Sequence, residues 1–163
     1  LDNVSVMVQL TALRLWSYNV AERLPTLLAT LSALETLSLP FNELWRLPRD
    51  LACLPSLRKL DLEGNYLSRV PVELGGGAAS RLQHLHLRRN SKLVVDDEGL
   101  AVLHSLTALT YVNIDGFARL KCHWAGSEGL LRAIENGHST QVTPTRDWTF
   151  IPDENHSLSL PCF

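Results

Sequence analysis

The chain has 163 residues, of which 45% are hydrophobic and 20% are charged, with a formal net charge of −2. This composition indicates one folded domain and excludes a disordered chain, and no stretch approaches the roughly 20 consecutive apolar residues of a spanning helix, so no membrane insertion is expected. The small net charge excludes a global attraction to nucleic acid, and three cysteines without close spacing favour an intracellular, cytoplasmic location.

Apolar residues recur with a fixed period along most of the chain. The pattern Leu-x-x-Leu-x-Leu-x-x-Asn-x-Leu starts at Leu10, Leu34, Leu57, Leu82 and Leu109, at intervals of 24, 23, 25 and 27 residues. The copies at Leu34 and Leu57 match at every landmark, and the other three are weaker or shifted. A period in this range is typical of structural units that stack on one another. The sequence therefore predicts a solenoid of about five repeats.

Residues 1–9 precede the first full copy. Val4 and Met7 stand six and three places before Leu10, which is the spacing of apolar residues before the later copies. We therefore expect residues 1–9 to be the second half of a partial repeat. Because an open repeat end exposes apolar core and the sequence has no polar cap here, we expect a fragment or a chain with further repeats before Leu1.

Each copy contains a Leu-x-Leu pair followed by a turn position. Two leucines that are two residues apart point to the same side of a short strand, and the residue between them points to the other side. Asn42, Asn65 and Asn90 stand three places after the second leucine, where the chain must turn away. Tyr18 and Phe117 replace the asparagine in the two outer copies. Each unit is thus predicted to begin with a strand whose leucines face the core.

The return legs begin with Leu47-Pro48 and Val70-Pro71. In the first of them Leu51 and Leu54 keep a helical spacing, so we expect a short helix after the turn. A bundle of long amphipathic helices is the alternative arrangement for such leucines. The prolines between residues 25 and 71 would interrupt those helices, which favours the solenoid.

The return leg between Val70 and Leu82 departs from this pattern. Residues 74–80 read Leu-Gly-Gly-Gly-Ala-Ala-Ser. Because each glycine costs a helix about 1 kcal/mol relative to alanine, a flexible convex loop is expected here. No Lys-Ser or Lys-Thr pair follows the glycines, which argues against a phosphate-binding loop.

The landmarks from Leu10 to about Ile134 resemble those of the leucine-rich-repeat family, and the Leu-Pro return legs are similar to those of its cytoplasmic members. The resemblance implies an α/β solenoid, with a curved parallel β-sheet on the concave face and short helices or irregular turns on the convex face. It also implies that the asparagine amides bond neighbouring backbone groups and build a buried ladder. This ladder would end near Tyr18 and Phe117.

The repeat pattern stops after Phe117. Residues 127–137 are predicted to form a capping helix, because a serine can cap its start, apolar residues share one face and Asn136-Gly137 can end it. We therefore place the solenoid at residues 1–137 and an irregular C-terminal cap or tail at residues 138–163. Cys122 resembles the start of the cysteine cap of extracellular members, but Trp124 stands where those carry a second cysteine.

The outward residues of the predicted strands form the concave face, where a solenoid of this kind would bind a partner. Aromatic residues gather at its N-terminal end, acidic residues in the middle and basic residues after them. Exposed aromatic residues beside charged ones are typical of protein interfaces, so we predict a protein partner, within a larger complex. The predicted partner-binding residues are Arg14, Trp16, Ser38, Phe41, Lys59, Asp61, Glu63, His84, His86, Arg88, Arg89, Tyr111, Asn113 and Asp115.

Part of this face has a simpler interpretation. The acidic residues Asp61 and Glu63 and the basic residues Arg88 and Arg89 would neutralise one another as a solvated charge ladder across neighbouring strands. This alternative removes the four charged residues from the partner site but leaves the aromatic end unexplained.

No catalytic or metal site is predicted. His84 and His86 share a strand face, but the sequence marks no third metal ligand. Cys53 lies in a leucine-rich segment typical of core, and Cys122 has only a sequence-adjacent histidine, which is not the spatial pairing that a thiol nucleophile needs. We therefore expect a chain that is not an enzyme and that needs no cofactor.

The preferred function is a non-enzymatic scaffold for protein–protein interaction. One alternative is the ligand-sensing domain of an immune-type or extracellular receptor, for which Asn3 and Asn155 would be glycosylation sites. The other is a subunit of a ribonucleoprotein or another large complex, in which the basic patch from His84 to Arg89 would contact phosphate. The net charge makes nucleic acid the less favoured partner.

Overall fold

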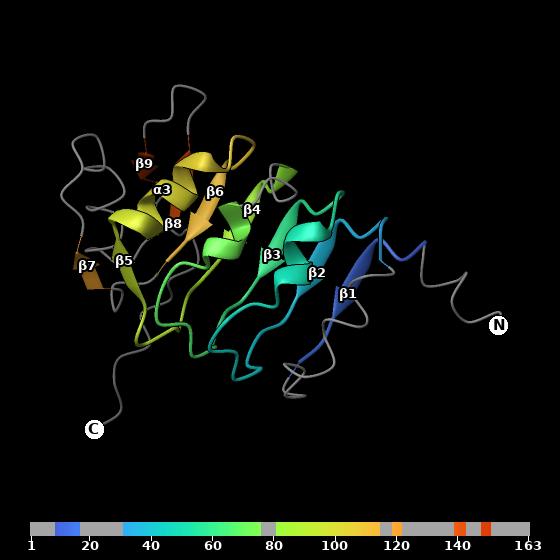
Figure 1. Cartoon of the computed structure of the whole chain (residues 1–163), viewed down its shortest axis with the longest axis horizontal. Helices are drawn as coiled ribbons and strands as arrows, with labels where there is room; N and C mark the ends of the chain where they lie inside the picture. Colours follow the sequence, from blue (N-terminus) through green and yellow to red (C-terminus); the bar gives the residue numbers. More distant parts are fainter. Residues whose placement is uncertain are drawn as a thin grey trace.

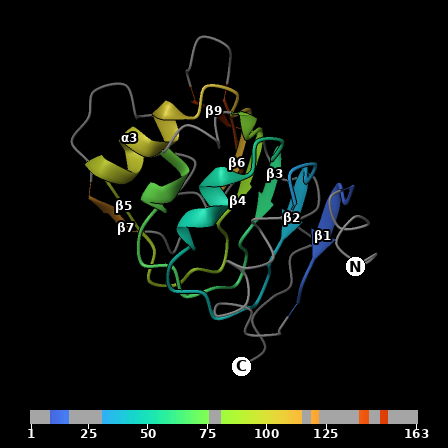
Figure 2. The same cartoon turned by 45° about the vertical axis from the view of Figure 1, so that its right-hand side comes forward.

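The structure is a computed structural model that describes residues 9–16, 31–75, 81–114, 119–121, 139–142 and 148–150. Successive repeats stack in one direction, so that neighbouring strands belong to neighbouring repeats (Figure 1). The strands lie on one side of the stack and the helical segments on the other (Figure 2). This two-layer arrangement is the expected α/β solenoid.

Parallel strands form the concave side of the described residues. They are β1 (Ala12–Arg14), β2 (Thr36–Ser38), β3 (Lys59–Asp61), β4 (His84–His86) and β6 (Tyr111–Asn113), and they lie side by side in chain order. Their central residues are in register across all five strands, from Leu13 through Leu37, Leu60 and Leu85 to Val112. Because each turn of the solenoid adds one strand, the repeat period sets this register, and the predicted parallel sheet is confirmed.

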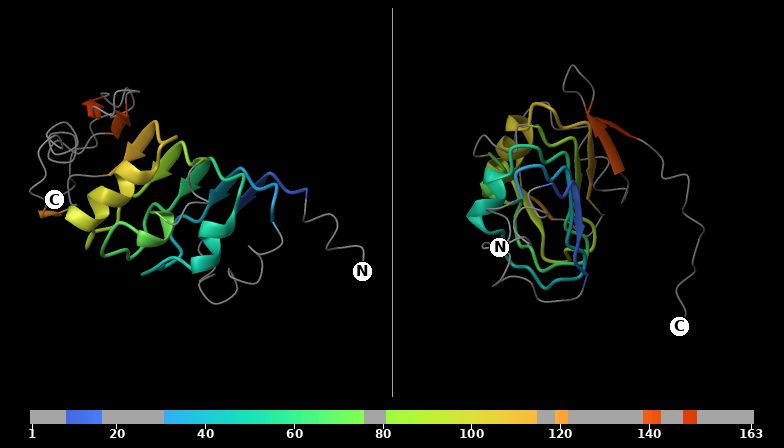
Figure 3. Two further views of the ribbon diagram at one scale, coloured as in Figure 1. Left: turned by 45° about the horizontal axis from the view of Figure 1, so that its top comes forward. Right: turned by 90° about the vertical axis from the view of Figure 1, so that its right-hand side faces the viewer.

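The convex side carries short helical segments, seen below the strands in the left view of Figure 3. Two of them are 3-10 helices, η2 (Arg49–Cys53) and η3 (Val72–Gly75), and the third is the α-helix α3 (Asp97–Ser105). The short helix expected in the return leg is thus present in these repeats, as a 3-10 helix rather than an α-helix. The two prolines leave few residues for a helix in this return leg. η2 starts after Pro48 and must end before Pro55, because a residue that precedes proline avoids the α-helical backbone conformation.

The glycine-rich return leg is ordered at its start. Leu74 and Gly75, which the sequence assigns to a flexible loop, belong to η3, and Leu74 is buried. The other glycines lie outside the described residues. In the next repeat Asp96 caps α3, since its carboxylate accepts a hydrogen bond from the backbone N–H of Gly99 at 2.9 Å, and Asp97 and Glu98 complement the positive end of the helix.

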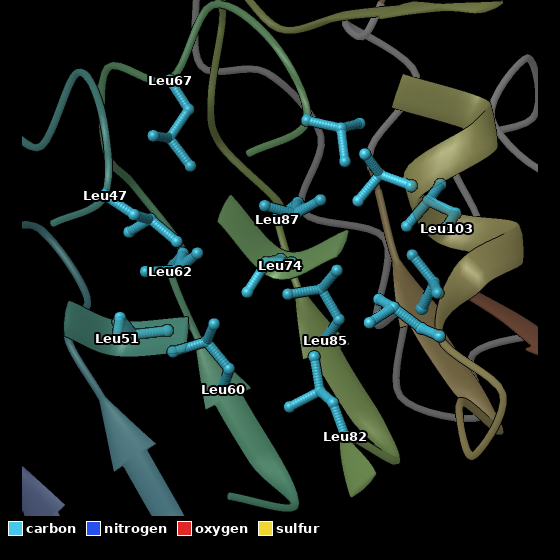
Figure 4. Close-up of a cluster of buried hydrophobic side chains, with 14 of the residues drawn as sticks. Leu47, Leu51, Leu60, Leu62, Leu67, Leu74, Leu82, Leu85, Leu87 and Leu103 are labelled. Carbon is cyan, nitrogen blue, oxygen red and sulfur yellow. The ribbon is translucent and has the colours of Figure 1, made fainter. Parts of the chain in front are cut away.

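Leucines from the two layers meet in one apolar core (Figure 4). Leu51 of η2, Leu74 of η3 and Leu103 of α3 point toward the strand leucines, of which Leu60 and Leu85 are fully buried. Burying a leucine side chain stabilises the fold by about 1.5–3 kcal/mol. The core therefore supplies the rigid support on which the concave residues are displayed.

A ladder of buried asparagines joins the repeats, as expected. The side-chain oxygen of Asn65 accepts hydrogen bonds from the backbone N–H groups of Asn42 and Leu44, at 3.1 and 2.9 Å. Its amide nitrogen donates to the carbonyls of Leu39 and Leu62, each at 2.9 Å. Asn42 and Asn90 make equivalent bonds, to Leu15 in the preceding repeat and to Leu62. The amides thus satisfy backbone groups that the turn would otherwise bury without partners.

The C-terminal region contains strands where an irregular segment was expected. β8 (Ser139–Val142) pairs antiparallel with β6, and β9 (Trp148–Phe150) pairs antiparallel with β8, so the sheet continues beyond the last repeat. A second, two-stranded sheet is formed by β5 (Val94–Asp96) and β7 (Arg119–Lys121). An unpaired edge strand leaves backbone groups without partners, and β8 covers that edge of β6.

Several sequence predictions fall outside the described residues. They are residues 1–8 of the partial repeat predicted at residues 1–9, the ladder ends at Tyr18 and Phe117, and the capping helix at residues 127–137. No helix within the described ranges has the length and apolarity that crossing a membrane requires.

Candidate binding surface

Two rows of outward residues cross the concave face. In each strand the central residue packs into the core, and its two neighbours flank it on the other side of the sheet. Strand register places equivalent neighbours side by side, at the spacing of about 4.8 Å that separates paired strands. The first row is Ala12, Thr36, Lys59, His84 and Tyr111, and the second is Arg14, Ser38, Asp61, His86 and Asn113.

The N-terminal half of this face is hollowed. The hollow has a volume of about 420 Å³ and lies over β1, β2 and β3. It exists because the rows carry small side chains there, at Ala12, Thr36 and Ser38, while larger side chains stand beside them. The larger side chains that line the hollow are those of Arg14, Lys59, Asp61 and His86.

Ser38 and Asp61 form a fixed pair in the hollow. The hydroxyl of Ser38 donates to Oδ2 of Asp61 at 2.9 Å, and the backbone N–H of Glu63 donates to Oδ1 of Asp61 at 3.1 Å. Both carboxylate oxygens of Asp61 are therefore engaged within the chain. The sequence predicts Ser38 as a partner-binding residue, whereas the side chain is only 8% exposed. It shapes the hollow rather than projecting from it.

An aromatic stripe, made of Arg14, Trp16, Phe41 and Arg89, follows the edge of the face at which the strands end. Trp16 is 56% exposed, and its ring centroid lies 6.2 Å from that of Phe41. The guanidinium carbons of Arg14 and Arg89 lie 5.9 Å from the ring centroids of Trp16 and Phe41, respectively. Arginine over an aromatic ring is a favourable cation–π contact. The stripe thus brings together residues that the sequence separates by three repeats.

The left-handed backbone conformation of Phe41 and Arg89 determines where their side chains lie in the aromatic stripe. The residue before each ladder asparagine has a positive φ, which is 55° at Phe41, 67° at Gly64 and 56° at Arg89. This conformation costs a residue other than glycine about 1–2 kcal/mol. At Gly64 a side chain has no room, because a Cβ there would lie 2.3 Å from Cδ1 of Phe41. The ring of Phe41 therefore lies over Gly64. Pro40, the residue before Phe41, is buried.

Ion pairing across the face is partial. Nε of Arg89 lies 3.4 Å from Oε1 of Glu63, which is one rung of the predicted charge ladder. Asp61 binds Ser38 and the backbone instead. Within the described part of the chain, neither Arg14 nor Lys59 forms an ion pair with a carboxylate. Two cations at the hollow are therefore not neutralised by the ladder.

The C-terminal half of the face is filled by aromatic rings. The ring centroid of Tyr111 lies 5.7 Å from that of His84 and 5.2 Å from that of His86. The amide of Asn113 donates to the hydroxyl of Tyr111 at 3.2 Å, and Asn113 is only 7% exposed. Asn113, like Ser38, is a predicted partner-binding residue that is largely withdrawn from the surface.

Burial disfavours the charged forms of both histidines. It lowers the pKa of His84 below its usual value, and the positive charges of Lys59 and His86 act in the same direction. Burial also lowers the pKa of His86, and Lys59 adds to this, although the carboxylates of Asp61 and Glu63 oppose it. Both imidazoles are therefore neutral near pH 7.

The histidines do not form part of a metal site among the residues that the structure describes, where no three His, Cys, Asp or Glu side chains come together. His84 and His86 share a strand face as predicted, but Tyr111 packs against both. Asp115, a predicted partner-binding residue, lies outside the described residues, as do Cys122 and its neighbours and the side chain of Cys53.

Ala12 and Thr36 are not among the partner-binding residues predicted from the sequence. Both line the hollow. The signal was present in the sequence, since small outward residues on two adjacent strands leave space between larger neighbours. It was missed because a missing side chain is a weaker sequence feature than an aromatic or a charged one.

Comparison with known proteins supports the fold. Residues 8–67 match the family model described as leucine rich repeat. An internalin from Listeria monocytogenes is 21% identical, with 76% of this chain and 33% of that chain covered and a TM-score of 0.50. A leucine-rich-repeat protein from Leptospira interrogans is 24% identical, with 70% and 30% covered and a TM-score of 0.49. Human trophoblast glycoprotein is 32% identical, with 58% and 32% covered and a TM-score of 0.44.

Of these three structures the internalin alone reaches a TM-score of 0.5, and at 21% identity it shows the fold alone. The chain spans about a third of the length of each solved chain, and no curated protein matches it. The family match covers residues 8–67, and within this range the structure has the parallel strands β1, β2 and β3 and part of the asparagine ladder. The chain therefore contains a leucine-rich-repeat domain, a type of domain that generally binds other proteins rather than catalysing a reaction.

Proposed function

We propose that the chain is a non-enzymatic interaction module that binds a protein partner through its concave face. The hollow over β1, β2 and β3 carries this proposal, because it is a concave site beside an exposed tryptophan, Trp16, and two cations without ion-pair partners. Buried pockets next to exposed aromatic and arginine side chains are where the binding energy of protein interfaces concentrates.

The backbone at the aromatic stripe supports a binding role. Phe41 and Arg89 keep a left-handed conformation that Gly64 adopts at lower cost in the repeat between them. Strained residues of this kind cluster at functional sites. Here the strain holds the ring of Phe41 between Trp16 and Arg89, which gives a partner a preorganised apolar contact.

A protein fits this face better than a nucleic acid. Asp61 and Glu63 lie in the middle of the sheet, where the backbone of a nucleic acid would have to pass, and their negative charges would repel phosphates. As part of the same proposal, we place the partner in a larger intracellular complex, a location favoured by the odd number of cysteines. A receptor domain or a ribonucleoprotein subunit would use the same fold with a different partner.

Two exposed tryptophans provide the test. Trp16 lies beside the guanidinium of Arg14, which lines the hollow, whereas Trp45, which is 63% exposed, lies in the turn between the sheet and η2. The tagged chain is purified from its native cells, the co-purifying protein is isolated, and the affinity of the purified pair is measured. Trp16→Ala should weaken binding at least tenfold, as truncation of an interface hot spot does, and Trp45→Ala should change it less than twofold.

The reverse pattern, or unaltered binding by Trp16→Ala, would refute the assignment of this face. A binder that proves to be RNA, with affinity that falls steeply as salt rises, would replace the proposal by the ribonucleoprotein alternative.

A further inference from the structure

We propose that the hollow receives an acidic side chain of the protein partner, seated over β2 between Arg14 and Lys59. This inference rests on the proposed function, because it names the chemistry of the partner at the same face. It follows from three properties of the hollow: its shape, the state of its charged groups and the position of its carboxylates.

The shape leaves room over β2 for one side chain. β2 contributes Thr36 and Ser38 to the face, and both are small. Arg14 stands on β1 and Lys59 on β3, so the two cations flank β2 from opposite sides. Paired strands are about 4.8 Å apart and a strand rises about 3.3 Å per residue, so an offset of two strands and two residues separates the backbones of Arg14 and Lys59 by roughly 12 Å. A carboxylate placed over β2 would therefore lie within reach of both flexible side chains.

The charged groups of the hollow favour an anion. Arg14 and Lys59 form no ion pair in the described part of the chain, so each can accept an external carboxylate without breaking an internal bond. Asp61, the carboxylate that lines the hollow, already accepts hydrogen bonds from Ser38 and from the backbone of Glu63. These neutral donors leave Asp61 its negative charge, but they hold its carboxylate beside Ser38, so Arg14 and Lys59 are the flexible charged side chains of the hollow that an incoming carboxylate would meet.

The carboxylates of Asp61 and Glu63 favour a single acidic side chain over a continuous chain of phosphates as the bound anion. A phosphate chain that continued from Lys59 toward the basic residues of the next repeat would pass Asp61 and Glu63. An acidic side chain of a protein ends at its carboxylate and avoids both. The neighbouring ring of Trp16, which the guanidinium of Arg14 approaches to 5.9 Å, would pack against the apolar residues beside that acidic residue.

The test reverses charge on both sides of β2. Arg14→Glu and Lys59→Glu replace exposed cations, so the fold should be retained, and Arg49→Glu on the convex helix η2 is the matched control. Binding of the native partner isolated with the tagged chain should fall at least tenfold in each of the first two variants and less than twofold in the control. Thermal unfolding of each variant checks that the fold is intact.

A peptide probe locates the site without the partner. A capped peptide with one glutamate among alanines, titrated into the full chain, should shift the backbone amide NMR signals of residues 36–38 and 59–61, and the same peptide with glutamine in place of glutamate should not. Lys59→Glu should abolish these shifts, and Arg49→Glu should leave them unchanged. Equal shifts from both peptides, or shifts confined to other residues, would overturn the inference.

The outcomes separate this inference from the proposed function. If Trp16→Ala weakens partner binding while Arg14→Glu and Lys59→Glu do not, the concave face binds a protein, but the partner does not place an acidic side chain between Arg14 and Lys59. If all three variants bind as the unmodified chain does, the proposed function fails as well. Binding of oligouridylate at residues 36–38 at lower concentration than the glutamate peptide would overturn the inference in favour of nucleic acid.

Discussion

The two halves of the concave face are built on the same sheet but present different surfaces. Over β1, β2 and β3 the outward positions hold small residues, and a hollow of about 420 Å³ remains. Over β4 and β6 the rings of His84, His86 and Tyr111 pack against one another and fill the equivalent space. The backbone register is continuous through both halves. The size of the outward side chains, and not the path of the backbone, therefore decides where the face is hollow.

The largest expected effect is the loss of stability when the asparagine ladder, which supports both halves of the face, is interrupted. Asn65 is buried, and Asn65→Ala would leave the N–H groups of Asn42 and Leu44 and several carbonyls without partners. Each such buried group costs about 1–3 kcal/mol, so the free energy of unfolding should fall by about 3 kcal/mol or more. Chemical denaturation measures this loss.

Tyr66→Ala is the matched control for this prediction. Tyr66 follows Asn65 directly but is exposed, so its removal should change the free energy of unfolding by less than about 0.5 kcal/mol. Equal decreases in the free energy of unfolding of the two variants would show that the asparagine ladder does not stabilise the sheet.

A smaller effect should follow from making the hollow half resemble the filled half. Thr36→Phe places a ring over β2, where Thr36 lines the hollow. Partner affinity should fall about tenfold, which corresponds to roughly 1.4 kcal/mol, while the free energy of unfolding stays within about 0.5 kcal/mol of the original. Isothermal titration with the native partner measures the affinity. Undiminished binding would mean that the partner does not enter the hollow.

The smallest expected effect is the pH dependence of stability that His84 and His86 cause in the half of the face that is filled by aromatic rings. Because the pKa values of His84 and His86 are lowered in the folded state, the unfolded chain binds more protons below pH 6.5. The histidine contribution to stability is thus fully present above pH 6.5 and is lost as the pH falls through the folded pKa values. Lys59, Asp61 and Glu63 are the other charged groups that act on the two rings.

Denaturation at pH 7.5 and at pH 5.5 tests this sign. The unmodified chain should lose more stability between the two values than the double variant His84→Gln/His86→Gln, whose glutamines do not titrate. A variant that loses as much as the unmodified chain would show that the two imidazoles are protonated as easily in the folded chain as in the unfolded one.

The repeat architecture could be predicted because it depends on local spacing. Leu37 and Leu39 are two residues apart and face the core, so the strand could be deduced from one repeat and the register from the period. The ladder that includes Asn42 was implied by the family resemblance. The strands β8 and β9 could not be deduced in this way, because β8 pairs with β6 across a long separation in sequence. Such pairing leaves no periodic signal.

The candidate site could be predicted only in outline. The sequence indicates which residues of each strand point outward, and Trp16, Arg14 and Lys59 are on the face as expected. The burial of Ser38 and Asn113 depends on side chains of other residues, Asp61 in one case and Tyr111 in the other. The hollow likewise arises from the combined sizes of residues in three repeats, which no single repeat reveals.

Site-specific photocrosslinking tests the central claim most directly. A photoreactive residue is introduced at Thr36, on the concave face, and in a second variant at Glu73, in the convex helix η3. Each variant is irradiated in complex with the native partner, and the crosslinked peptides are identified by mass spectrometry. We predict a crosslink to the partner from position 36 and none from position 73. A crosslink from position 73 alone would contradict binding through the concave face.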